Sequence, residues 1–82
     1  MPAPDQPVDA ALAAVLRRLR EARGLSQEAT AQAAGVSLNT YSRIELAQAS
    51  PTWPTVRAIA KALDVSMAEL GAAVDADSAR SR

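Results

Sequence analysis

Apolar residues recur at three- and four-residue spacing along most of this chain, which places them on one face of an α-helix. Five helical stretches are predicted, each preceded by a residue whose side chain favours a helix start. These residues are Asp9, Ser26, Ser37, Thr52 and Ser66. Gly24 and Gly35 stand where the first two helices should end, because glycine readily adopts the left-handed backbone of a helix terminus. No stretch shows β-strand alternation, so the pattern predicts a compact all-α fold of five helices.

The second predicted helix, residues 27–34, differs from the others. It contains alanines and Thr30 but no large apolar residue, so it cannot be anchored by burial of its own side chains. Alanines allow neighbouring backbones to approach closely, and this composition favours a small helix wedged against its neighbours. The third helix follows after Gly35 and is expected to run from Ser37 to Leu46 or Ala47.

One hydrophobic core is expected from the helical phase of the larger apolar side chains. Tyr41 and Trp53 are the only aromatic residues, and either is a possible stacking partner for nucleic-acid bases. Their helical phase places both with the apolar residues, and we therefore assign both to the core. The predicted core comprises Leu16, Leu19, Val36, Tyr41, Ile44, Trp53, Val56, Ile59, Leu63, Val65 and Leu70.

The 82 residues suffice for one small domain. Residues 1–7, "MPAPDQP", hold three prolines and no apolar periodicity, which predicts a disordered N-terminal arm. The end of the chain, residues 75–82 ("DADSARSR"), is small and polar and predicts a disordered tail. We therefore expect the folded domain to span residues 8–74.

Composition argues against several classes of function. With no cysteine and no histidine, the chain lacks the usual zinc ligands and the usual general base. No pair of carboxylates is clustered in the sequence, so we expect neither an enzyme nor a bound metal or cofactor. The absence of disulfides fits a reducing compartment, and no apolar run reaches the ~18 residues of a membrane span. We expect a cytoplasmic protein with no membrane partner.

Two consecutive short helices joined at a glycine form the pattern of a helix-turn-helix. At these positions the chain resembles the phage-repressor/Cro-like (XRE-type) helix-turn-helix family. The resemblance covers roughly residues 12–71 and is carried by "RGLSQEATAQAAGVS", "SRIE" and "VRAIAKALDVSMAEL". It implies a compact five-helix, repressor-like DNA-binding domain. It also implies a sequence-specific transcriptional regulator that places its third helix in the major groove of double-stranded DNA.

The resemblance also implies roles for particular residues. Positions at the start of the third helix contact base edges in this family, and here they are Leu38, Asn39 and, one turn later, Arg43. Asparagine can pair with adenine, arginine with guanine, and an apolar tip with the thymine methyl group. Contacts to phosphate are expected from Gln27, Ser37, Thr40 and Ser42. Gln27 opens a helix, where free N–H groups and the helix dipole favour an anion.

The family tends to bury an arginine–glutamate pair between its first and third helices. Glu45 supplies the carboxylate, but the arginine is ambiguous, because Arg23 lies in the middle of the apolar stripe of the first helix and Arg20 on its edge. The resemblance favours Arg20, and we expect Arg20 and Glu45 to form a structural ion pair.

Two departures from the family weaken the DNA-binding interpretation. The net charge is 0, from 9 basic and 9 acidic residues, whereas DNA-binding domains are usually basic. The loop after the third helix reads "LAQAS", without the glycine and cations common in the family. An alternative function is therefore a protein-interaction module, such as the antitoxin of a toxin pair. For the DNA-binding function we expect a homodimer on a palindromic operator. The expected contact is the fifth helix and the end of the fourth, around Met67, Leu70 and Val74.

Overall fold

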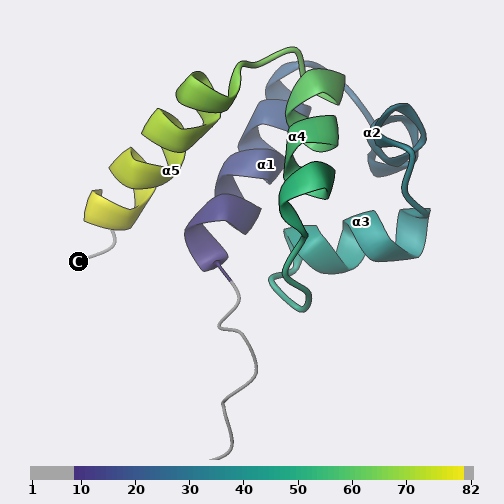
Figure 1. The fold of residues 1–82 in the computed structure, drawn as a ribbon, viewed down its shortest axis with the longest axis horizontal. Coiled ribbons are helices and arrows are strands. Elements are labelled where there is room, and N and C mark those ends of the chain that lie inside the picture. The colour runs from purple at the N-terminus through teal and green to yellow at the C-terminus, as the bar shows by residue number, and fades with distance from the viewer. Residues whose placement is uncertain (1–8, 81–82) are drawn as a thin grey trace, which may run out of the picture.

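The computed structural model describes residues 9–80, and within them it contains five α-helices and no strand (Figure 1). The all-α prediction is therefore confirmed. The helices are α1 (Ala10–Ala22), α2 (Gln27–Ala34), α3 (Leu38–Glu45), α4 (Trp53–Ala62) and α5 (Met67–Arg80). None of these helices combines the length and the apolar character needed to cross a bilayer. The predicted disordered arm, residues 1–7, lies outside the described residues.

Each predicted N-cap residue directly precedes the first residue of its helix. Asp9, Ser26, Ser37 and Thr52 each accept a hydrogen bond from the backbone N–H three residues later. Ser66 and Glu69 form the reciprocal capping box of α5, with bonds of 2.9 and 3.0 Å. These bonds satisfy N–H groups that would otherwise lack a partner at a helix start.

The core lies where α1, α3, α4 and α5 converge, and α2 packs against α4 and α3 (Figure 1). Ala31 and Ala34 are buried on the inner side of α2, as the wedge interpretation expects. Thr30 is fully buried beside them, and its hydroxyl donates to the Ser26 carbonyl at 3.0 Å. That bond offsets the cost of burying a hydroxyl.

The core prediction is wrong for Trp53, whose side chain is 65% exposed. Helical phase correctly places Ile59 of α4 in the core, together with Leu63 at the C-cap of that helix. Trp53 is the first residue of that helix, and residues 52–54 are all exposed. Phase specifies the face of a helix, but here no neighbouring helix covers that face at its first turn.

The prediction of a disordered tail is wrong for residues 75–80, which continue α5 to Arg80. Asp77 accepts a bond from Arg18 of α1 at 2.7 Å and lies 3.3 Å from Arg80. Earlier in α5, Leu70 is buried in the core, and Met67 and Val74 pack against it. Contacts with α1 therefore support a segment whose composition alone predicts fraying.

Candidate nucleic-acid interface

The turn between α2 and α3 depends on Gly35. Its φ of +74° lies in the left-handed region, where a side chain is strained. The N–H of Val36 bonds back to the Ala31 carbonyl at 3.0 Å, which closes α2 in the manner of a Schellman motif. Ser37 then caps α3, so that two short helices are joined by a turn of three residues.

The two faces of α3 differ sharply. Tyr41, Ile44 and Glu45 are buried on the inner face. On the outer face Leu38, Asn39 and Arg43 are exposed. Positions four residues apart lie on one side of a helix, so Asn39 and Arg43 share a face. Neither side chain has a hydrogen bond or an ion pair among residues 9–80, which leaves both available to an outside partner.

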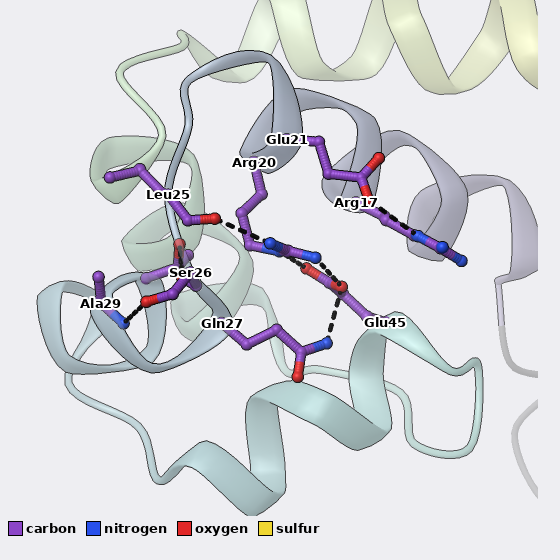
Figure 2. Close-up of polar contacts among 9 residues, drawn as sticks. Arg17, Arg20, Glu21, Leu25, Ser26, Gln27, Ala29 and Glu45 are labelled. Carbon is purple, nitrogen blue, oxygen red and sulfur yellow. Dashed lines mark hydrogen bonds and ion pairs between the residues drawn. The ribbon is translucent and has the colours of Figure 1, made fainter.

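Arg20 and Glu45 form a two-pronged ion pair that ties α1 to the end of α3 (Figure 2). The Arg20 Nε donates to Glu45 Oε2 at 2.6 Å, and Nη2 donates to Oε1 at 3.1 Å. The third nitrogen of Arg20, Nη1, donates to the Leu25 carbonyl at 2.8 Å. The Arg20 side chain is 13% exposed and that of Glu45 only 2%. The structure thus brings together the two residues expected to pair, whereas Arg23 lies 3.4 Å from the Asp64 carbonyl.

Gln27 joins this cluster, a contact that the sequence did not indicate. Its Nε2 donates to Glu45 Oε1 at 2.9 Å (Figure 2). A phosphate can only accept hydrogen bonds. The Gln27 side-chain amide can therefore bind a phosphate through an N–H group but not through its oxygen. One N–H is committed to Glu45, and the second remains for the phosphate contact expected of this residue. The Gln27–Glu45 hydrogen bond could not be predicted from local sequence, because it forms only when the start of α2 lies beside the end of α3.

The protonation of this cluster follows from its contacts. Burial by itself would raise the pKa of Glu45, but hydrogen bonds from Arg20 and Gln27 outweigh it and lower that pKa. The bond to Glu45 raises the pKa of Arg20. The Tyr41 hydroxyl is buried nearby and meets no described partner at hydrogen-bond geometry. Burial, and then the Glu45 carboxylate, raise the pKa of Tyr41. Near pH 7 the cluster therefore holds an ionised Glu45 carboxylate, a protonated Arg20 guanidinium and a neutral Tyr41 phenol.

The remaining expected phosphate contacts lie on or just before α3. The Ser37 hydroxyl accepts from the Thr40 N–H at 3.0 Å and lies 2.9 Å from the Thr40 hydroxyl. Two hydroxyls that share one bond retain one hydroxyl hydrogen for an outside acceptor. Ser42 is half-buried.

The loop after α3 folds back on that helix. The N–H of Gln48 bonds to the Arg43 carbonyl at 2.8 Å, and Ala47 has a left-handed φ of +57°. No cation lies in residues 46–50. No group of three or more His, Cys, Asp or Glu side chains within residues 9–80 is arranged to hold a metal ion.

Comparison with known proteins identifies the family. Residues 11–73 match the model of a helix-turn-helix domain. The clp gene regulator ClgR from Corynebacterium glutamicum has a similar structure, with a TM-score of 0.86, 24% identity, and coverage of 95% of this chain and 83% of that one. The restriction-modification controller protein C.AhdI from Aeromonas hydrophila is 33% identical over 74% of this chain and 92% of its own, with a TM-score of 0.72.

A second restriction-modification controller protein gives a TM-score of 0.82 at 20% identity, over 89% of this chain and 94% of that one. No protein with a curated description matches the sequence. The family match covers residues 11–73, which include all of α2 and α3. The chain therefore belongs to the helix-turn-helix domain family, as its resemblance to the repressor-like proteins predicts.

Proposed function

We propose that this protein is a sequence-specific DNA-binding transcriptional regulator that inserts α3 into the major groove. One observation carries the proposal. The inner face of α3 is fixed by burial and by the Arg20–Glu45 pair, while Asn39 and Arg43 project from its outer face without partners among the described residues. A helix held rigidly with free hydrogen-bonding groups on its outer side suits the reading of base edges.

The proposal assigns direct readout to Leu38, Asn39 and Arg43. Asparagine and arginine supply the two-pronged contacts to adenine and guanine, and the half-exposed Leu38 meets a thymine methyl group. Phosphate contacts come from the second N–H of Gln27, from the hydroxyl hydrogen that Ser37 and Thr40 retain, and from Ser42. These contacts position α3 without reading sequence. The names of the similar proteins, a gene regulator and two controller proteins, agree with this role.

We further propose that the protein binds as a homodimer to a palindromic operator. One module of this size reads few base pairs, and a two-fold dimer matches two half-sites about one helical turn apart. The expected contact through Leu70 is not available, because that residue is 2% exposed in the core of its own chain. A monomer footprint limited to one half-site at saturation would contradict the dimer.

Selection of bound sequences from a random duplex pool tests the function directly, because it yields the operator and its symmetry together. On the selected site, Asn39→Ala and Arg43→Ala should each cost about 1–3 kcal/mol of binding, with much less loss on random duplex. Gln32→Ala provides a matched control, since Gln32 is an exposed amide on α2. If both α3 variants keep full discrimination, α3 does not read the sequence.

A protein-interaction module remains the second candidate, and the net charge of 0 favours it. Binding to DNA weakens with salt in proportion to the number of phosphates neutralised. The proposed function predicts a measurable but shallow slope of log affinity against log salt, roughly −3 to −5 for the dimer. Absence of any salt-dependent binding to duplex DNA would favour the protein-interaction module.

A further inference from the structure

An open depression lies along α4 and the start of α5, with a volume of about 640 Å³. A volume of this order is typical of sites for small molecules. The apolar part of its lining comes from Pro54, Ala58, Val65 and Met67. In Figure 1 the turn between α4 and α5 lies at the top of the molecule, whereas α3 lies at its lower edge. The depression is thus separate from the proposed reading surface of α3.

Charged side chains of both signs line the same depression. Arg57 and Lys61 lie one turn apart on α4, and Asp64 and Glu69 follow in the turn and at the start of α5. Glu69 is already engaged, because its Oε1 accepts the Ser66 N–H at 2.9 Å. The side chains of Arg57, Lys61 and Asp64 have no hydrogen bond or ion pair with any described residue. Two cations and one carboxylate are therefore free to contact a ligand.

The backbone of the turn that carries Asp64 is held by contacts with both neighbouring helices. Asp64 has a left-handed φ of +59°, a conformation that aspartate adopts more readily than most residues. The N–H of Val65 bonds to the Ala60 carbonyl at 3.0 Å, and Nη2 of Arg23 on α1 lies 3.4 Å from the Asp64 carbonyl. These contacts fix the main chain of the turn, while the Asp64 carboxylate itself stays unpaired beside the two cations.

We propose that this depression binds the zwitterion of a free amino acid with an apolar side chain. The carboxylate of the ligand pairs with Arg57 and Lys61, its ammonium group pairs with Asp64, and its side chain packs on Val65 and Met67. This inference goes beyond the proposed function and does not depend on it, because no residue assigned to DNA contact lines the depression.

The mixed charge of the lining favours a zwitterion over a simple anion or a simple cation. Arginine suits a carboxylate, because its guanidinium can donate two parallel hydrogen bonds to the two oxygens. A simple anion at Arg57 would gain that contact but would be repelled by the carboxylates of Asp64 and Glu69. A simple cation at Asp64 would be repelled by Arg57 and Lys61 in the same way. Because the lining is exposed to solvent, each contact contributes modestly, and we expect an affinity of roughly millimolar order.

Titration of the isotope-labelled full-length protein with L-leucine, followed by the chemical shifts of backbone amides in NMR spectra, tests the site. We expect saturable shifts centred on residues 57–67, with the amides of α3 unchanged. Isocaproate lacks the ammonium group of leucine and leucinamide lacks its carboxylate, so each should bind roughly two- to tenfold more weakly. Absence of saturable shifts with L-leucine would overturn the proposal. Isocaproate that binds as tightly as L-leucine would also overturn it, in favour of a general anion site.

Two variants identify which charge of the ligand meets which side chain. Arg57→Gln and Asp64→Asn each remove one charge from an exposed side chain and should leave the helical circular dichroism unchanged. Each should weaken L-leucine binding by roughly two- to tenfold. Arg57→Gln should not weaken the binding of leucinamide, and Asp64→Asn should not weaken that of isocaproate. Arg80→Gln is the control for net charge, since Arg80 lies at the far end of α5. If the two variants bind L-leucine as Arg80→Gln does, the depression is not the site.

A second copy of the chain is the other occupant that this surface could take, because it too carries charges of both signs. Dilution of the protein without any amino acid separates the two. Amide shifts of residues 57–67 that change with protein concentration, and that L-leucine leaves unaltered, would assign the depression to a second copy and overturn the proposal. Either failure leaves the proposed function untouched, since sequence discrimination by Asn39 and Arg43 is measured on DNA without an amino acid.

Discussion

Two arginines of α1, two positions apart, form ion pairs that differ in burial and in the number of hydrogen bonds. Arg20 gives three hydrogen bonds, two to Glu45 and one to the Leu25 carbonyl, and its side chain is 13% exposed. Arg18 gives one bond of 2.7 Å to Asp77 and is 50% exposed. The first pair fixes α3 relative to α1, and the second joins the end of α5 to α1. Desolvation and geometry, rather than the presence of opposite charges, should determine what each pair contributes.

The position of each pair explains its consequence for function. Glu45 ends the helix that begins with Leu38 and Asn39, so the orientation of the proposed reading surface depends on its bond to Arg20. Asp77 lies one turn from the end of α5, and no proposed DNA contact depends on it.

Glu45→Ala should have the largest effect on stability. It leaves the Arg20 guanidinium in a shielded site without its counter-charge, and breaking such a pair typically costs about 3–5 kcal/mol. That is a large share of the stability of a small domain. Urea unfolding of Glu45→Ala and of Glu28→Ala, an exposed glutamate on α2, gives the difference. Equal midpoints for the two variants would mean that the Arg20–Glu45 pair does not form in solution.

Acid should remove part of the same contribution. The folded state lowers the pKa of Glu45, so its contribution is fully present above the unfolded value of about 4.3. The contribution is lost as the pH falls through the lower, folded-state pKa. Glu45→Gln keeps the shape of the side chain without its charge. The melting temperatures of native protein and Glu45→Gln should therefore converge as the pH falls below about 4. A constant gap between the two curves would contradict a lowered pKa of Glu45.

Arg20→Lys keeps the charge but not the geometry. One ammonium group cannot reach both Glu45 oxygens and the Leu25 carbonyl together. Lost hydrogen bonds to a charged group are typically worth roughly 1.5–3 kcal/mol, and we expect a loss of that size in urea unfolding. Arg18→Lys provides the matched control, because its single exposed bond to Asp77 is one that lysine can replace. Equal losses for the two variants would remove the distinction between the pairs.

The sequence predicted the helix boundaries well because capping is local. Ser26, Ser37 and Thr52 accept hydrogen bonds from backbone N–H groups only three residues later, so a short stretch of sequence is enough to predict these bonds. The end of α5 was not predictable in this way, because the partner of Asp77 lies 59 residues away in Arg18. Composition indicated a frayed tail, and a tertiary contact overrides it.

Part of the candidate site was also predictable, because it too depends on local sequence. Helical phase is sufficient to place Asn39 and Arg43 on the outer face of α3, and both are exposed there. It was not sufficient for Trp53, because burial depends on how far the neighbouring helices extend. The bond between Gln27 and Glu45 also requires two chain segments to meet in space. That Asn39 and Arg43 contact DNA stays a prediction.

Gln27→Ala should have a smaller effect on stability than Arg20→Lys, with a second effect on binding. It removes one of the bonds to Glu45 but leaves the ion pair, and we expect a loss of about 1.5 kcal/mol in urea unfolding, the lower end of the range for a hydrogen bond to a charged group. Because the second N–H of Gln27 is proposed to contact phosphate, affinity should fall alike on the selected duplex and on random duplex. Gln32→Ala should change neither quantity. A loss confined to the selected duplex would mean that Gln27 reads bases.

Asp77→Asn should have the smallest effect of the series. It removes the negative charge that pairs with Arg18 and Arg80, but both arginine side chains are at least half exposed and stay solvated without that charge. Exposed ion pairs contribute little and are screened by salt, so the melting temperature at physiological ionic strength should match that of the native protein. Amide exchange should quicken only in the last turns of α5, where the bond to Arg18 holds the helix against α1. A fall in melting temperature as large as that of Glu45→Gln would show that both ion pairs of α1 stabilise the fold comparably.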